Sequence, residues 1–154
     1  MPDSSAEGFQ SPSRLALPLL ALALCWLLGC GQEAELAPAQ GKVLYNGQPL
    51  KFGSVMFQHE QGGQPSQAEI QPDGTFVLGT YEPGDGARIG RNQVAIYCYE
   101  SQDPAKAAAR SAGEQSLGRL LIPQRYAMLN TSGLSVEVKP EGNEPFVFNL
   151  TDKP

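Results

Sequence analysis

Short segments in which apolar and polar residues alternate make up most of the chain beyond residue 40, and turn residues separate them. The alternation is clearest in 134–139 and again in 146–151. A period of two places successive side chains on opposite faces of a strand, so each segment has one apolar and one polar face. One buried face per strand is typical of antiparallel sheets. The pattern therefore predicts an all-β domain in which antiparallel sheets pack as a β-sandwich.

Turn signals divide the rest of this pattern into short strands. Asn46-Gly47 is a strong signal for a tight hairpin. In the triplet 72–74, Pro-Asp-Gly, the proline presets φ and the glycine accepts positive φ. The remaining segments predict strands at 42–46, 54–60, 67–71, 75–78 and about 92–100, with a long loop at 81–90. We expect the strands on either side of 72–74 to pair as a hairpin.

Residues 103–119 depart from the alternation because they are rich in alanine. Asp103 suits an N-cap, Pro104 suits the first helical position, and Gly113 would end a helix. The segment predicts a short helical insertion of about two turns on the surface. Helices this short are marginal without packing, so partial disorder is the alternative interpretation.

An uncharged apolar run at 15–29 follows Arg14 and ends at Cys30. A transmembrane helix needs about 20 apolar residues, whereas the apolar part of a secretory signal peptide needs about 7–15. The length of the run therefore favours a signal peptide at 1–29. An uncleaved anchor and a buried helix are the alternatives.

The last residues of this region, Leu27-Leu28-Gly29-Cys30, resemble the lipobox of bacterial lipoprotein precursors. In that family diacylglycerol alkylates the cysteine, the chain is cleaved before it, and the new amino group is acylated, with palmitate as an expected chain. The resemblance implies an exported lipoprotein that Cys30 anchors to a membrane of the cell envelope, on its periplasmic face or outer surface. Because 31–40 lacks periodicity, we expect a signal peptide at 1–29, a lipidated tether at 30–40 and a β-sandwich domain at 41–152.

Charge and cysteine content narrow the range of partners. The formal net charge of −5 offers no basic footprint, so we expect no nucleic-acid partner. Loss of Cys25 with the signal peptide and lipidation of Cys30 leave Cys98 alone, which excludes an intramolecular disulfide in the mature domain. Cys98 lies in an apolar stretch and is predicted to be a buried small hydrophobe rather than a reactive thiol.

The segment 41–53 (GKVLYNGQPLKFG) and the hairpin 72–76 (PDGTF) together resemble the opening of carboxypeptidase regulatory-like domains. Those domains have a transthyretin-like, seven-stranded β-sandwich. Segments 81–87, 122–126 and 131–138 are similar to small lipoproteins common in planctomycete bacteria. The resemblance implies a fold rather than an activity, because in metallocarboxypeptidases the similar domain is an accessory without catalytic residues.

The chain offers few residues for catalysis or metal binding. One histidine, His59, and one remaining cysteine do not suffice for a zinc site or a conventional catalytic triad. Glu82, Asp85 and Asp73 are candidate oxygen ligands for calcium, but the spacing of a calcium-binding loop is absent and turn chemistry explains them better. We therefore expect no catalytic residue, no metal and no cofactor.

Tyr97 and Tyr99 are the aromatic candidates for binding, because they share one face of a predicted strand. If Val94, Ile96 and Cys98 point into the core, the two tyrosine rings stand side by side on the exterior, where they would stack on a sugar or a protein partner. The alternative is that the tyrosines are in the core and the helical insertion covers the other face.

These features favour a membrane-tethered, non-catalytic binding or structural module of the bacterial cell envelope. Besides the membrane, its expected partner is an envelope protein or a glycan. The alternative is a carbohydrate-binding module that uses Tyr97, Tyr99 or the 81–90 loop. A third interpretation is a hydrolase with Glu82 and Asp85 as its acid–base pair, although no feature of the sequence positions either carboxylate.

Overall fold

The computed structural model describes residues 35–107 and 116–153, and Ala34–Pro154 forms one compact unit. The predicted signal peptide and the lipidation site Cys30 lie outside the described residues. The described elements are β1 (Leu36–Ala37), β2 (Gln40–Tyr45), β3 (Gln48–Pro49), β4 (Ser54–His59), β5 (Ser66–Glu69), β6 (Thr75–Val77), β7 (Ala87–Arg88), β8 (Gly90–Tyr97), η2 (Glu100–Gln102), α2 (Pro104–Ala107), η3 (Gln124–Ala127), β9 (Ser135–Val138) and β10 (Phe146–Leu150). Within these ranges, no helix is long and apolar enough to cross a membrane.

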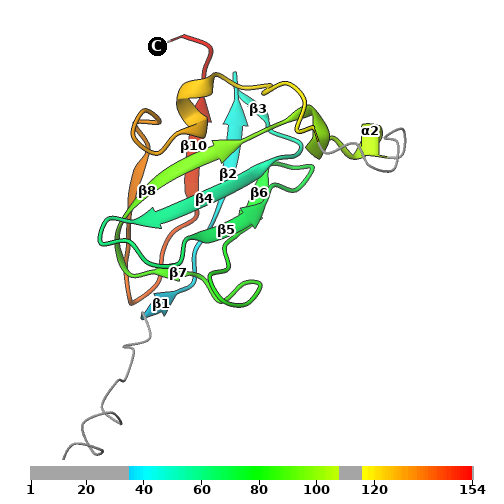
Figure 1. Cartoon of the computed structure of the whole chain (residues 1–154). Coiled ribbons are helices and arrows are strands. Elements are labelled where there is room, and N and C mark those ends of the chain that lie inside the picture. The colour runs from blue at the N-terminus through cyan, green and yellow to red at the C-terminus, as the bar shows by residue number, and fades with distance from the viewer. Residues whose placement is uncertain (1–34, 108–115, 154) are drawn as a thin grey trace, which may run out of the picture. The chain divides into compact units, whose positions relative to one another are not determined.

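Most strands belong to two four-stranded sheets (Figure 1). The first sheet has the order β10-β2-β3, with β6 also paired to β2, and the second has the order β5-β4-β8-β9. β1 and β7 form a separate two-stranded ribbon. All the strand pairs described, except β10 with β2, are antiparallel. The predicted all-β class with antiparallel sheets is confirmed.

The pairing of β10 with β2 is parallel and runs from Phe146 opposite Gly41 to Leu150 opposite Tyr45. This pair differs from the purely antiparallel arrangement that we predicted. Alternation specifies which face of a strand is buried, and this face is the same for parallel and antiparallel neighbours. The direction of β10 instead follows from the chain's crossing from β9, in the second sheet, to the edge of the first sheet.

Both predicted turns are present, and they differ in how the flanking strands pair. Asn46 and Gly47 both have positive φ, 50° and 79°, and join the antiparallel strands β2 and β3. In the second turn Gly74 has φ 86°, and the Asp73 carboxylate accepts a hydrogen bond of 3.0 Å from the backbone N–H of Thr75. Hydrogen bonds join the segments that flank it, from the N–H of Gln71 to the Thr75 carbonyl at 2.8 Å and between Gln67 and Gly79 at 2.8 and 3.0 Å, as the predicted hairpin requires. Between these points the two segments belong to different sheets, because β5 pairs with β4 and β6 pairs with β2. The second turn therefore connects the two sheets.

The folded domain begins earlier than predicted. Leu36 and Ala37 form β1, and Ala37 and Ala39 are only 1% and 2% exposed. The folded structure therefore extends into the predicted tether at 30–40, with its first strand at Leu36 and the first strand of the two large sheets at Gln40. Two small alanine side chains fill the core there, and such side chains produce little hydrophobic signal in the sequence.

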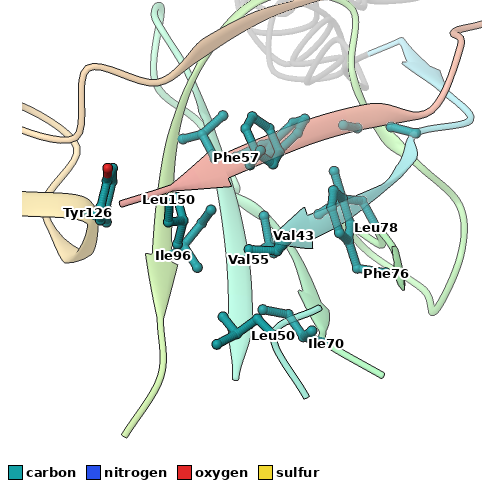
Figure 2. Packing of buried hydrophobic residues seen from close by; sticks show 14 of the residues in the cluster. Val43, Leu50, Val55, Phe57, Ile70, Phe76, Leu78, Ile96, Tyr126 and Leu150 are labelled. Atoms are coloured by element: carbon teal, nitrogen blue, oxygen red, sulfur yellow. The ribbon is translucent and has the colours of Figure 1, made fainter. Parts of the chain in front are cut away.

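The two sheets pack face to face on one hydrophobic core (Figure 2). Val43 from the first sheet and Val55 from the second point into the same space and are fully buried. Phe57 on β4 makes edge-to-face contacts with three other aromatic rings, with centroid distances of 6.3, 5.6 and 6.0 Å to Phe76, Phe146 and Phe148. The inward positions of β10 agree with the predicted alternation.

The helical insertion is only partly described. Asp103 caps α2 by accepting a hydrogen bond of 2.9 Å from the backbone N–H of Ala105, as expected for an N-cap before Pro104. The described helix has four residues and follows the 3-10 helix η2. Residues 108–115 of the predicted helical segment lie outside the described residues.

A candidate binding groove on the outer face

Register places the two candidate tyrosines on the outside of the second sheet. Val94, Ile96 and Cys98 are at most 1% exposed, so the residues that alternate with them face away from the core. The rings of Tyr97 and Tyr99 stack with their centroids 6.5 Å apart and their planes 14° apart. Both side chains are half-buried, and burial raises the pKa of Tyr97 above its ordinary value. The structure therefore places the pair on the exterior.

A groove of about 740 Å³ opens near this face, between β5, the 79–84 loop and η2. Its volume lies within the range of small-ligand sites, about 300–1,000 Å³. Its main polar and aromatic side chains are Ser54, Gln67, Glu69, Tyr81, Glu82 and Gln102. Val77 and Tyr81 form an apolar part, and each is 57% exposed. The groove therefore combines hydrogen-bonding and apolar surface in one place.

Gln102 joins the tyrosine pair to the groove. Its side-chain oxygen accepts a hydrogen bond of 2.8 Å from the backbone N–H of Tyr99, and its amide nitrogen donates one of 3.2 Å to the Ser54 hydroxyl. Ser54 lies directly across from Tyr97 in the β4–β8 pairing. The tyrosine pair and the groove are therefore neighbouring parts of one surface.

Asp85 positions the loop that forms one wall of the groove. Its carboxylate accepts hydrogen bonds of 2.6, 3.0 and 2.9 Å from the backbone N–H groups of Thr80, Tyr81 and Glu82. Burial by itself raises the pKa of Asp85, but these three hydrogen bonds outweigh it and hold the pKa below its ordinary value. Asp85 is therefore a positioning residue that keeps Tyr81 and Glu82 at the groove.

The structure brings together some of the sequence candidates and separates others. Glu82 lines the groove and Tyr97 lies beside it, whereas Asp85 is directed at the backbone of the loop. Gln67, Glu69 and Gln102 were not among the sequence candidates. For Gln67 and Glu69 the signal was the polar alternation of a predicted strand, but alternation does not show what lies opposite that face. Gln102 carried no such signal, because it follows the strand.

The other chemically interesting residues lie apart from the groove. His59 is 8% exposed and accepts a hydrogen bond of 3.1 Å at Nδ1 from the backbone N–H of Gln61. Across from it on β8, Asn92 donates through its side-chain amide to the carbonyls of Arg88 and Gly90, at 2.9 and 2.8 Å. Among the described residues, no group of three or more His, Cys, Asp and Glu side chains is arranged to hold a metal ion.

The single cysteine of the described domain is buried, as the apolar stretch around it predicts. Cys98 is 1% exposed, and burial raises the pKa of its thiol to about 11. A thiol of this kind is almost entirely protonated at neutral pH, and the thiolate is the reactive form. Cys98 therefore serves as a packing residue.

Comparison with family models, curated proteins and solved structures finds no match to the chain. The interpretation of the groove accordingly depends on its own geometry and chemistry.

Replacing Asp85 by asparagine tests the positioning role. We expect the variant to lose about 1–2 kcal/mol of unfolding free energy at pH 7, because a neutral amide accepts backbone N–H groups less strongly than a carboxylate. The pKa of Asp85 is lowered in the folded state, so its contribution is complete above the unfolded value of about 3.9 and disappears as the pH falls through the folded value. Urea unfolding at pH 7 and pH 3 measures both effects.

The difference between wild type and Asp85→Asn should therefore shrink toward pH 3. Glu144→Gln is the matched control, since Glu144 is an exposed carboxylate in the β9–β10 connection. An equal loss of stability in both variants at pH 7 would contradict the proposed role of Asp85.

Proposed function

We propose that this protein is a membrane-tethered, non-catalytic binding module of the bacterial cell envelope, anchored by lipid on Cys30. The observation that carries the binding role is the groove, because mixed polar and apolar surface with an exposed aromatic side chain is characteristic of ligand sites. The stacked Tyr97 and Tyr99 extend that surface beyond the groove. The lipobox-like Leu27-Leu28-Gly29-Cys30 supports the anchor.

The engagement of Asp85 supports a binding role over a hydrolytic one. A hydrolase built on Glu82 and Asp85 would need one carboxyl group to exchange protons near neutral pH. Asp85 instead accepts three backbone hydrogen bonds, and its pKa is lowered rather than raised. This environment favours a carboxylate that is ionised at neutral pH, which suits a structural role.

The arrangement of the strands supports a seven-stranded sandwich of the carboxypeptidase regulatory-like, transthyretin-like kind. Three of the ten described strands, β1, β3 and β7, have two residues each, which leaves seven longer ones in two packed sheets. The segment 41–53, whose motif carries the resemblance, contains most of β2 and the β2–β3 turn. A fold of this kind is consistent with an accessory or binding domain and specifies no reaction.

The anchor is tested on protein isolated from its own membranes. We expect a mature mass that corresponds to a chain beginning at Cys30 with added diacylglycerol and acyl groups, and release of the Cys30→Ser variant into the soluble fraction. An intact Met1 start, or an unmodified thiol at Cys30 in membrane-free protein, would contradict the tethered function.

The carbohydrate alternative is tested on the soluble fragment 31–154, which contains the whole described core. Glycan-array binding that Tyr97→Ala or Tyr99→Ala abolishes would favour a carbohydrate-binding module. The control is Val147→Ala, because Val147 is 56% exposed on β10 in the other sheet. Retention of glycan binding in the tyrosine variants would exclude the tyrosine pair as the platform.

A further inference from the structure

The groove contains two acidic side chains without basic partners. Glu69 comes from the outer face of β5 and Glu82 from the loop that forms the facing wall. Within the described part of the chain, neither forms an ion pair, whereas Glu60 pairs with Arg91 at 3.1 Å and Glu100 is near two basic side chains. None of the described residues that line the groove is basic. The groove is therefore an open site of negative potential.

An apolar surface lies in the same groove. Val77 and Tyr81 are among the few large hydrophobic side chains that are strongly exposed in the described domain, each at 57%. Both line the groove, and hydrogen bonds from the loop backbone to Asp85 hold Tyr81 beside Glu82. Both side chains therefore add apolar surface to the polar lining of the groove. The groove thus presents an aromatic ring and a carboxylate side by side.

We infer that this groove binds a basic, extended segment of a partner protein through lysine or arginine side chains. The inference deepens the proposed binding function and rests on it. The aliphatic stem of a lysine or arginine would lie along Val77 and Tyr81, because long basic side chains bury their methylene groups on apolar surface and leave the charge exposed. The cationic head would reach Glu82 or Glu69, and the Tyr81 ring adds a cation–π contact.

Charge complementarity favours this occupant over a neutral glycan. A neutral sugar donates its hydroxyl groups to amides and carboxylates alike, so it does not require two negative charges in the groove. A cation is attracted by both carboxylates and by the net negative charge of the chain. Gln67 then remains to hydrogen-bond the peptide backbone of the segment, and the Ser54 hydroxyl, which accepts from Gln102, still has a proton to donate.

The test is an NMR titration of ¹⁵N-labelled fragment 31–154 with tetralysine and tetraarginine peptides, and with tetraglutamine as the neutral peptide. We expect amide shifts clustered at Glu69, Gly79 and Glu82 with the basic peptides only. The Glu69→Gln/Glu82→Gln double variant should bind about tenfold more weakly, since two exposed ion pairs are lost. Tyr81→Ala should weaken binding while the charge of the groove stays unchanged.

The control is Glu141→Gln/Glu144→Gln, which removes two exposed carboxylates outside the groove and changes the net charge equally. Equal weakening in both double variants would show non-specific attraction to an acidic protein and would overturn the inference. Glycan-induced shifts in the groove that persist in Glu69→Gln/Glu82→Gln would also overturn it, while leaving the binding-module function intact. If neither the basic peptides nor glycans shift amide signals in the groove, both the basic-segment inference and the binding-module function are overturned.

Discussion

Replacing Phe57 by alanine is expected to lower the free energy of unfolding by about 3–5 kcal/mol, the usual cost of removing a buried aromatic side chain. Phe57 is 0% exposed and is in contact with the rings of Phe76, Phe146 and Phe148. Each edge-to-face contact adds about 0.5–1.5 kcal/mol beyond the burial of area. Phe57 lies on β4, whereas its ring partners lie on β6 and β10 in the other sheet. The loss of these three contacts therefore weakens the packing of one sheet on the other.

Urea unfolding of the fragment 31–154, followed by far-ultraviolet circular dichroism, measures this loss. The matched control is Val147→Ala on β10, because Val147 alternates with Phe146 and Phe148 but is 56% exposed. Its effect should stay within about 0.5 kcal/mol. Comparable destabilisation by the two substitutions would show that the inward and outward faces of β10 are not as described.

Replacing Gly86 by alanine is expected to cost about 3 kcal/mol or more, through strain and collision together. Gly86 has φ 101°, and a Cβ atom there would lie 2.1 Å from the carbonyl oxygen of Ala37. The obstacle is backbone, so no side-chain rotation relieves it. The N–H of Gly86 donates to the Leu78 carbonyl at 3.0 Å, and the Gly86 carbonyl accepts from the Thr80 hydroxyl at 2.9 Å. The collision would therefore separate β1 from the loop that carries Tyr81 and Glu82.

Gly142→Ala separates strain from collision. Gly142 has a similar φ of 111°, but a Cβ atom there meets nothing within 4 Å. We expect a cost of about 1–2 kcal/mol from backbone strain alone. Hydrogen exchange of the Ile89 amide, which donates to Glu35 at 3.1 Å beside the β1–β7 ribbon, should accelerate in Gly86→Ala and not in Gly142→Ala. Unchanged protection of Ile89 in both variants would mean that β1 does not pack against Gly86.

The two substitutions also bear on function. Phe57 supports the sheet whose outer face carries Ser54 and Tyr97, whereas Gly86 supports the loop that carries Tyr81 and Glu82. The two sides of the groove therefore depend on different parts of the core. A variant that loosens the loop without unfolding the sheets should reduce binding in the groove and leave the Tyr97 surface in place.

Alternation along the chain determined the all-β class, the buried face of β10 and, with Cys98 in the core, the exterior position of Tyr97. The turn residues Asn46-Gly47 determined the first hairpin. These features are local. In a strand, the face that a side chain takes is set by the count of residues along the backbone, and a tight turn is set by the φ values that its own residues accept. Small side chains weakened this signal at Ala37 and Ala39, so the start of the domain was predicted too late.

Only the tertiary structure decided the parallel pairing of β10 with β2, the assignment of β5 and β6 to different sheets, and the groove itself. Glu69 and Glu82 face one space because a loop folds back over a sheet, and Asp85 holds that loop through backbone groups that no side-chain pattern reveals. Such arrangements depend on which distant segments pack together. The energies that select them come from burial across the whole core, and a window of neighbouring residues does not contain them.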